Sequence, residues 1–225
     1  MFNYTVREKR VVVDGTPCLL IEPEGVSRGG VIHYHGLGSK KENHRFMASC
    51  LAASGYRVLV PDGLYHGERY EGEKEREIIS QVILSNLKEF DALASYLDEE
   101  VLFLTGHSMG SMSAGLIFHH RDQVLAASVI NGYLSYKDLD LEVPQELLAV
   151  DPIDFLDRVG DRHLLILHGE ADSSVDIDIQ RKYFEQARGY FKEGNLVMEE
   201  IPRLDHYITL AMLQRTIEFF EGITP

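Results

Sequence analysis

Short runs of apolar residues alternate with longer amphipathic segments along most of the chain. From residue 30 onwards the apolar runs are near-continuous, as expected for strands that are buried on both faces of a sheet. The pattern predicts strands at residues 6–13, 17–21, 30–34, 57–60, 101–105, 124–130, 163–167 and 196–201. The dipeptide Asp14-Gly15 between the first two is a strong signal for a β-hairpin.

The amphipathic segments predict helices at residues 41–54, 73–97, 109–120, 176–189 and 206–221. In the second of them, apolar residues such as Ile78, Val82 and Phe90 recur at helical spacing among charged residues. Strands that alternate with helices favour parallel pairing through right-handed crossovers. The sequence therefore predicts one α/β domain over residues 1–225, with a doubly wound, mostly parallel eight-stranded sheet and helices on both faces.

The segment 131–161 interrupts this rhythm, with two tyrosines, two prolines, many acidic residues and only short helical patterns. It follows a strand at the edge where parallel strands end. Two interpretations stay open: a small cap that folds over a site within the domain, or an ordinary long crossover that contains a helix.

Charge and composition narrow the range of partners. The formal net charge is −14 with an isoelectric point near 5.1, which disfavours binding to nucleic acid or to anionic membranes. The charged N-terminal residues lack the apolar region of a signal peptide, and no apolar run is long enough to span a bilayer. We therefore expect a cytoplasmic protein without a membrane partner. Cys18 and Cys50 have no disulfide-like spacing and are expected to be buried thiols.

The segment Gly106-His107-Ser108-Met109-Gly110 follows a predicted buried strand and opens a predicted helix. A G-x-S-x-G sequence between a strand and a helix is typical of a nucleophile elbow, in which a strained turn lifts the serine hydroxyl above the sheet edge. Glycines on either side let neighbouring chain pass close. The pattern predicts Ser108 as a nucleophile and the Met109 amide, at a helix N-terminus, as a donor to developing negative charge. The alternative is a tight turn with an inert serine.

A serine nucleophile needs a base, and the base needs a carboxylate that orients it. His206 lies beyond the last strand, directly before the predicted final helix, where a loop can reach the elbow. The alternative is a surface histidine near a helix start, with Asp205 as the cap. With a serine elbow of this type, the acid is expected between the serine and the histidine along the chain, at the end of the predicted strand 163–167. Asp172 is the predicted acid, and Glu170 is its rival.

The turn at His35-Gly36-Leu37 follows an early buried strand and can present a second amide, that of Leu37, to the serine. With Met109 it would form an oxyanion hole. His33 and His35 lie two residues apart on one face of a strand and, with His66, offer a rival metal site. No further ligand pattern supports a metal, so we expect these histidines to brace loops around the site.

Taken together, these residues resemble the α/β-hydrolase superfamily. The resemblance rests on the elbow, His35-Gly36, the stretch from Pro61-Asp62 to Arg69, the segment from His168 to Asp172, and His206. The sequence is most similar to small bacterial esterases of the dienelactone-hydrolase and prolyl-oligopeptidase-like group. The resemblance implies ester hydrolysis through an acyl-enzyme by the catalytic triad Ser108, Asp172 and His206, with Leu37 and Met109 as oxyanion donors.

Two features depart from that group. Dienelactone hydrolases proper use a cysteine nucleophile, whereas this chain has serine, and no residues are left to build the propeller domain of prolyl oligopeptidases. The prediction is therefore a serine carboxylesterase for small to medium esters, with a small-molecule ester substrate and no cofactor. A thioesterase or a peptidase-like amidase on the same triad, and a non-catalytic binding protein, are the alternatives. The oligomeric state stays open.

Overall fold

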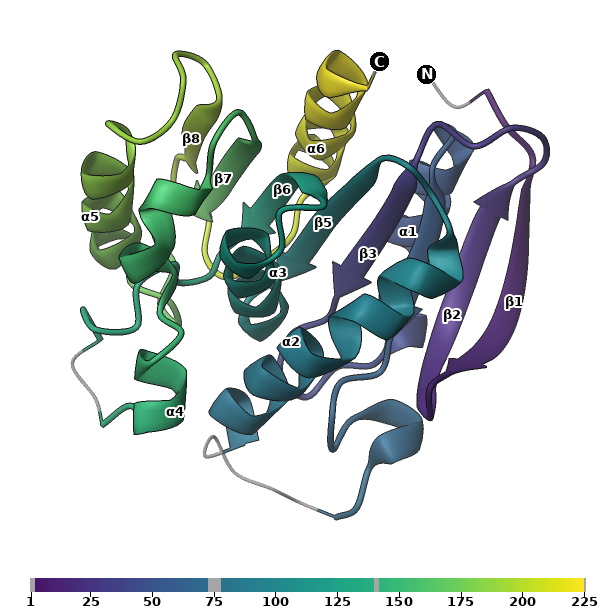
Figure 1. The fold of residues 1–225 in the computed structure, drawn as a ribbon, viewed down its shortest axis with the longest axis horizontal. Coiled ribbons are helices and arrows are strands. Elements are labelled where there is room, and N and C mark those ends of the chain that lie inside the picture. Colours follow the sequence, from purple (N-terminus) through teal and green to yellow (C-terminus); the bar gives the residue numbers. More distant parts are fainter. Residues whose placement is uncertain (1–2, 73–77, 140–141, 225) are drawn as a thin grey trace.

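The computed structural model describes residues 3–72, 78–139 and 142–224, and within them eight strands form one continuous sheet. Their order is β1-β2-β4-β3-β5-β6-β7-β8 (Figure 1). Antiparallel pairing is limited to β1 with β2 and β2 with β4; the pairs from β4 to β8 are parallel. The mostly parallel sheet confirms the prediction. The strands are β1 Val6–Val13, β2 Thr16–Pro23, β3 Gly30–Tyr34, β4 Arg57–Pro61, β5 Leu102–His107, β6 Val124–Ile130, β7 His163–Gly169 and β8 Leu196–Ile201.

Helices cover both faces of the sheet. The longer ones are α1 Arg45–Ala53, α2 Ile78–Leu97, α3 Met109–His120, α5 Ile177–Ala187 and α6 Leu210–Ile223. Shorter pieces are the 3-10 turns η1 Lys41–His44, η2 Gly67–Arg69 and η3 Pro152–Arg158, and the single-turn α4 Gln145–Leu148. Residues 73–77, predicted to start the second helix, lie outside the described residues.

The final helix begins later than the sequence predicts. Its cap is Thr209, whose side chain accepts a hydrogen bond from the Met212 amide, and α6 starts at Leu210. A threonine at this position satisfies an amide that has no partner within the helix. The predicted start at His206 is therefore wrong, and Asp205 is not a helix cap. His206 lies in a loop, residues 202–209, between β8 and α6.

Two hydrophobic cores lie on opposite faces of the sheet. Phe90 of α2, Ile117 of α3 and Tyr183 of α5 are fully buried in the core on one face. Leu51 of α1 and Phe220 of α6 are buried in the other. Figure 1 shows α2, α3 and α5 in front of the sheet and α1 and α6 behind it. Burial on both sides explains why the parallel strands are apolar along their whole length.

The segment 131–161 contains α4 and η3. Its buried residues Tyr136 and Leu147 pack with Val82 of α2 and with Met112 of α3. Tyr136 also donates a hydrogen bond from its hydroxyl to the Met112 carbonyl at 3.1 Å. The segment therefore covers one end of α2 and α3, and its action as a cap stays a prediction.

Cys18 and Cys50 are free, buried thiols, as the sequence indicates. None of the helices in the described ranges is long and apolar enough to cross a membrane.

Candidate active site

The loops that follow the parallel strands meet at one edge of the sheet. Backbone hydrogen bonds between neighbouring strands continue into these loops. The Ser108 amide donates to the Ile130 carbonyl at 2.9 Å, and the Asn131 amide donates to the Leu167 carbonyl at 3.0 Å. The Glu170 amide donates to the Ile201 carbonyl at 3.0 Å. The loops after β5, β6, β7 and β8 therefore lie side by side, which is where open parallel sheets place their sites.

Ser108 occupies a strained turn between β5 and α3, with φ 56° and ψ −125°. A Cβ atom at Gly106 would lie 2.3 Å from the Gly110 carbonyl oxygen, and one at Gly110 would lie 2.1 Å from that of Tyr34. No larger residue fits at either position without moving backbone. The two glycines are thus required for the turn, and such strain in a backbone often marks a functional position.

Two amides lie beside this serine. Met109 is the first residue of α3, so its N–H has no partner within the helix. On the other side, a Cβ atom at Gly36 would lie 3.3 Å from Ser108 Cβ and 3.3 Å from the His107 carbonyl oxygen. The chain that leads into Leu37 therefore passes directly against the elbow, where an oxyanion donor would be needed.

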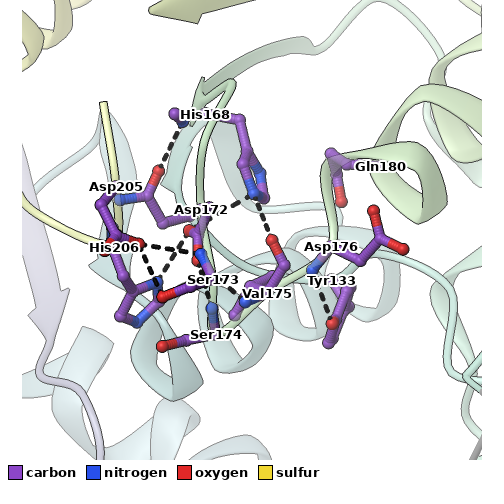
Figure 2. Close-up of polar contacts among 12 residues, drawn as sticks. Tyr133, His168, Asp172, Ser173, Ser174, Val175, Asp176, Gln180, Asp205 and His206 are labelled. Atoms are coloured by element: carbon purple, nitrogen blue, oxygen red, sulfur yellow. Dashed lines mark hydrogen bonds and ion pairs between the residues drawn. The ribbon is translucent and has the colours of Figure 1, made fainter. Parts of the chain in front are cut away.

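The structure brings Asp172 and His206 together. His206 Nδ1 lies 2.8 Å from Asp172 Oδ2, and the Asp172 side chain is fully buried (Figure 2). The other carboxylate oxygen accepts the amides of Ser174 at 2.9 Å and Val175 at 2.8 Å. Because a carboxylate only accepts, Nδ1 of His206 carries the proton and Nε2 is left as a base. Glu170, the rival, is exposed and forms no hydrogen bond or ion pair with His206.

Asp205 fastens the same two loops from their outer side. Its Oδ1 accepts the Ser173 amide at 2.8 Å, the Ser173 hydroxyl at 2.9 Å and the His206 amide at 2.8 Å (Figure 2). These bonds lower the pKa of Asp205. The side chain that the sequence suggested as a helix cap thus joins the residue after Asp172 to His206 itself.

His206 also lies beside the elbow. Its ring centroid is 4.8 Å from that of His107, the residue before Ser108. Burial, and then the neighbouring His206, lower the pKa of His107 to about 4, so His107 is neutral near pH 7. A neutral neighbour leaves His206 free to take up a proton without a full positive charge already beside it.

Two other histidines near the site, His35 and His66, bind backbone, whereas His33 lies 2.7 Å from the side chain of His44. His35 Nδ1 donates to the Gly36 carbonyl at 2.8 Å, and its Nε2 accepts the Gly63 amide at 2.9 Å. His66 similarly binds the Leu64 carbonyl and the Gly38 amide. Both rings therefore join the loop after β3 to the loop after β4. Among the described residues no group of three or more His, Cys, Asp or Glu side chains could hold a metal ion.

Sequence reasoning missed three residues at the ends of β6 and β7. A Cβ atom at Gly132 would lie 1.9 Å from Ser111 Oγ, and one at Gly169 would lie 2.3 Å from the Leu204 carbonyl oxygen. Asn131 has a positive φ of 52° and is fully buried. The Asn-Gly pair directly after a strand was the available signal, since these residues tolerate left-handed backbone.

A pocket of about 570 Å³ opens beside Leu37. Its wall includes Ser39, Tyr65, His66 and Tyr70, from the loops after β3 and β4. The volume is in the range that small-molecule sites occupy.

Comparison with known proteins gives relatives along nearly the whole chain, although no protein-family model matches. The protein named "Esterase YjfP" from Escherichia coli (strain K12) is 28% identical over 216 residues, covering 84% of this chain and 87% of that protein. "Putative esterase YitV" from Bacillus subtilis (strain 168) is 26% identical over 248 residues, covering 93% and 96%.

Solved structures share the fold. TT1662 from Thermus thermophilus superposes with a TM-score of 0.87 at 24% identity, over 98% of both chains. The "Putative Dienelactone Hydrolase" from Klebsiella pneumoniae superposes with a TM-score of 0.77 at 18% identity, again over 98% of both. The chain thus has the α/β-hydrolase fold. The relatives named as esterases agree with the sequence resemblance to the α/β-hydrolase superfamily.

Proposed function

We propose that this protein is a serine carboxylesterase that hydrolyses small to medium esters through an acyl-enzyme. The observation that carries the proposal is the Asp172–His206 hydrogen bond of 2.8 Å beside the strained Ser108 turn. The relatives named as esterases support the choice of ester bonds.

In the proposed reaction, Ser108 Oγ attacks the ester carbonyl carbon while His206 Nε2 takes the hydroxyl proton. The carbonyl oxygen becomes an oxyanion, which the Leu37 and Met109 amides stabilise. His206 then gives its proton to the leaving alkoxide, so that an alcohol departs and an acyl-enzyme remains. A water molecule repeats these steps on the acyl group and releases the carboxylic acid and free Ser108.

Asp172 supports each proton transfer without becoming protonated. Its Oδ2 holds the His206 ring with the proton on Nδ1, and its buried negative charge stabilises the imidazolium that forms. The two amides on Oδ1 keep the carboxylate in place. For the ester itself, the pocket beside Leu37, with Tyr65 and Tyr70 in its wall, supports a substrate with a modest apolar or aromatic part.

The test compares wild type, Ser108→Ala and Ser95→Ala on p-nitrophenyl esters of increasing chain length, together with labelling by a fluorophosphonate. Ser95 is an exposed serine of α2 and serves as the control. We expect Ser108→Ala alone to lose turnover, by a factor on the order of 10⁴ or more, and labelling. Undiminished hydrolysis by Ser108→Ala contradicts the serine mechanism. A thioester and an anilide in the same panel test the thioesterase and amidase alternatives, and a wild type without labelling would favour a binding protein.

A further inference from the structure

Asn131 lies directly after β6, between the loop that contains Asp172 and the loop that contains His206. Its side chain and backbone bind two segments, the end of β7 and the loop 202–209. The backbone N–H of Asn131 donates to the Leu167 carbonyl of β7 at 3.0 Å. Side-chain Oδ1 accepts the Gly169 amide at 3.1 Å, and Nδ2 donates to the Tyr207 carbonyl at 3.2 Å.

These partners are next to the proposed acid and base. Gly169 ends β7 three residues before Asp172, and Tyr207 directly follows His206. The loop 202–209 has no helix or strand of its own, and one backbone bond, from the Ala171 amide to the Leu204 carbonyl at 2.9 Å, ties it to the loop that contains Asp172. Side-chain bonds supply the other ties around His206. Asp205, a residue of this loop, ties it to Ser173 on the exposed side, and the fully buried Asn131 binds it through the Tyr207 carbonyl.

Asparagine meets both demands of this position. Its backbone adopts φ 52°, a left-handed conformation that asparagine tolerates better than most residues. Its amide side chain supplies one acceptor and one donor at once, which fits an N–H on one side and a C=O on the other. Aspartate would supply no donor, and glycine would supply neither group. Because the residue is fully buried, water cannot replace a lost partner easily.

We propose that Asn131 is a positioning residue, which sets the place of His206 relative to Asp172 and Ser108 through its bonds to Gly169 and Tyr207. The expected effect of Asn131 on turnover rests on the proposed function. The positioning role also predicts a property of the free enzyme: without the Asn131 side chain, the Asp172–His206 bond is no longer held at one geometry.

The experiment compares Asn131→Gly and Asn131→Asp with wild type. Glycine accepts the left-handed backbone and removes both side-chain bonds, whereas aspartate keeps the acceptor for Gly169 and turns an oxygen toward the Tyr207 carbonyl. Asp98→Gly is the matched control, since Asp98 is exposed, has φ 51° and lies between α2 and β5. Turnover is expressed per folded molecule, from urea unfolding curves.

We expect kcat to fall on the order of 100-fold in both Asn131 variants with KM changed less than about threefold, because a small misplacement of a catalytic group lowers the rate steeply. A second readout needs no substrate: the downfield proton resonance of His206 Nδ1–H bonded to Asp172, identified by its loss in His206→Ala, should broaden or disappear in both variants and persist in Asp98→Gly. Wild-type kcat per folded molecule with an unchanged resonance overturns the proposal. The resonance remains informative even if Ser108→Ala shows that ester hydrolysis is the wrong reaction.

Discussion

Oδ2 of Asp172 lies 2.8 Å from Nδ1 of His206, although 34 residues separate the two in the sequence. The bond joins the loop after β7 to the loop before α6, and it leaves His206 Nε2 as the only ring nitrogen that can accept a proton. Asp172 can hold this geometry because its second oxygen is already bound by two amides.

Replacing Asp172 by asparagine should disable the base while leaving the fold intact. An asparagine side chain can offer its N–H to the His206 ring, which then carries its proton on the wrong nitrogen. We expect kcat for a short p-nitrophenyl ester to fall by a factor on the order of 10⁴, as known for the same exchange in other serine hydrolases. Glu170→Gln is the control, because that exposed carboxylate forms no hydrogen bond or ion pair with His206. Equal losses in both variants would argue against Asp172 as the acid.

Gly169→Ala should displace the loop that contains His206. The added Cβ would lie 2.3 Å from the Leu204 carbonyl oxygen and 3.0 Å from that of Asp205, so this backbone has to move. Steady-state kinetics should show kcat reduced about 10- to 100-fold. Gly189→Ala, where a Cβ meets nothing within 4 Å, should keep full activity. Wild-type kcat in Gly169→Ala would mean that the loop tolerates the shift.

Lys41 of η1 and Asp62, the residue directly after β4, form a buried ion pair, and breaking it on one side should be costly. Lys41 Nζ lies 2.5 Å from Asp62 Oδ2, and both side chains are at most 1% exposed. Burial raises the pKa of Asp62, but its bonds to Lys41 and to two amides outweigh this and lower it overall. Lys41→Met leaves a buried charge unpaired, which should reduce the free energy of unfolding by about 3–5 kcal/mol.

Two further variants test whether the unpaired buried charge of Asp62 causes the loss of stability. Lys41→Met combined with Asp62→Asn should be less destabilised in urea unfolding than Lys41→Met alone, because no buried charge is left unpaired. Asparagine keeps an acceptor for only one of the Lys41 and Glu68 amides, which bind different oxygens of Asp62. Arg45→Met breaks the exposed pair with Glu8 and should cost about 1 kcal/mol or less. If the double variant is the less stable of the two, desolvated charge is not the main cost.

Stability should fall as the pH drops from about 6.5 toward 4, because buried histidines resist protonation. Burial lowers the pKa of His35 to about 4 and that of His44 to about 3. The unfolded chain takes up these protons near pH 6.5 while the folded chain does not, so the stabilisation is complete above pH 6.5 and is lost below it. Each such histidine contributes roughly 1.4 kcal/mol per pH unit in this window.

The His33–His44 contact offers a specific check. His33 Nε2 lies 2.7 Å from His44 Nδ1, so one nitrogen donates and the other accepts; a proton added to the acceptor would set two N–H groups against each other. The slope of unfolding free energy between pH 6.5 and 5 should therefore be smaller in His44→Gln than in wild type. An identical slope would show that these histidines do not control acid stability.

The local pattern of apolar and polar residues was sufficient to predict much of the fold. Apolar runs identified the strands to within about two residues, and the small residues around Ser108 indicated the turn that the structure contains. The order of serine, carboxylate and histidine along the chain pointed to His206 and to Asp172, with Glu170 as a rival, and Asp172 and His206 do lie in contact. The pattern did not find the start of α6, because the apolar residues Tyr207 and Ile208 before the Thr209 cap extend the helical pattern toward His206.

What the tertiary structure decided concerns contacts between loops that are distant in sequence. Only the folded chain shows that Asp172 and not Glu170 meets His206, that Asp205 binds Ser173, and that Asn131 joins Gly169 to Tyr207. Periodicity reports which side of a strand or helix is buried, since burial follows from local geometry. Loops have no such period, and their positions follow from individual hydrogen bonds and close backbone approaches that appear only when the sheet brings the strand ends together.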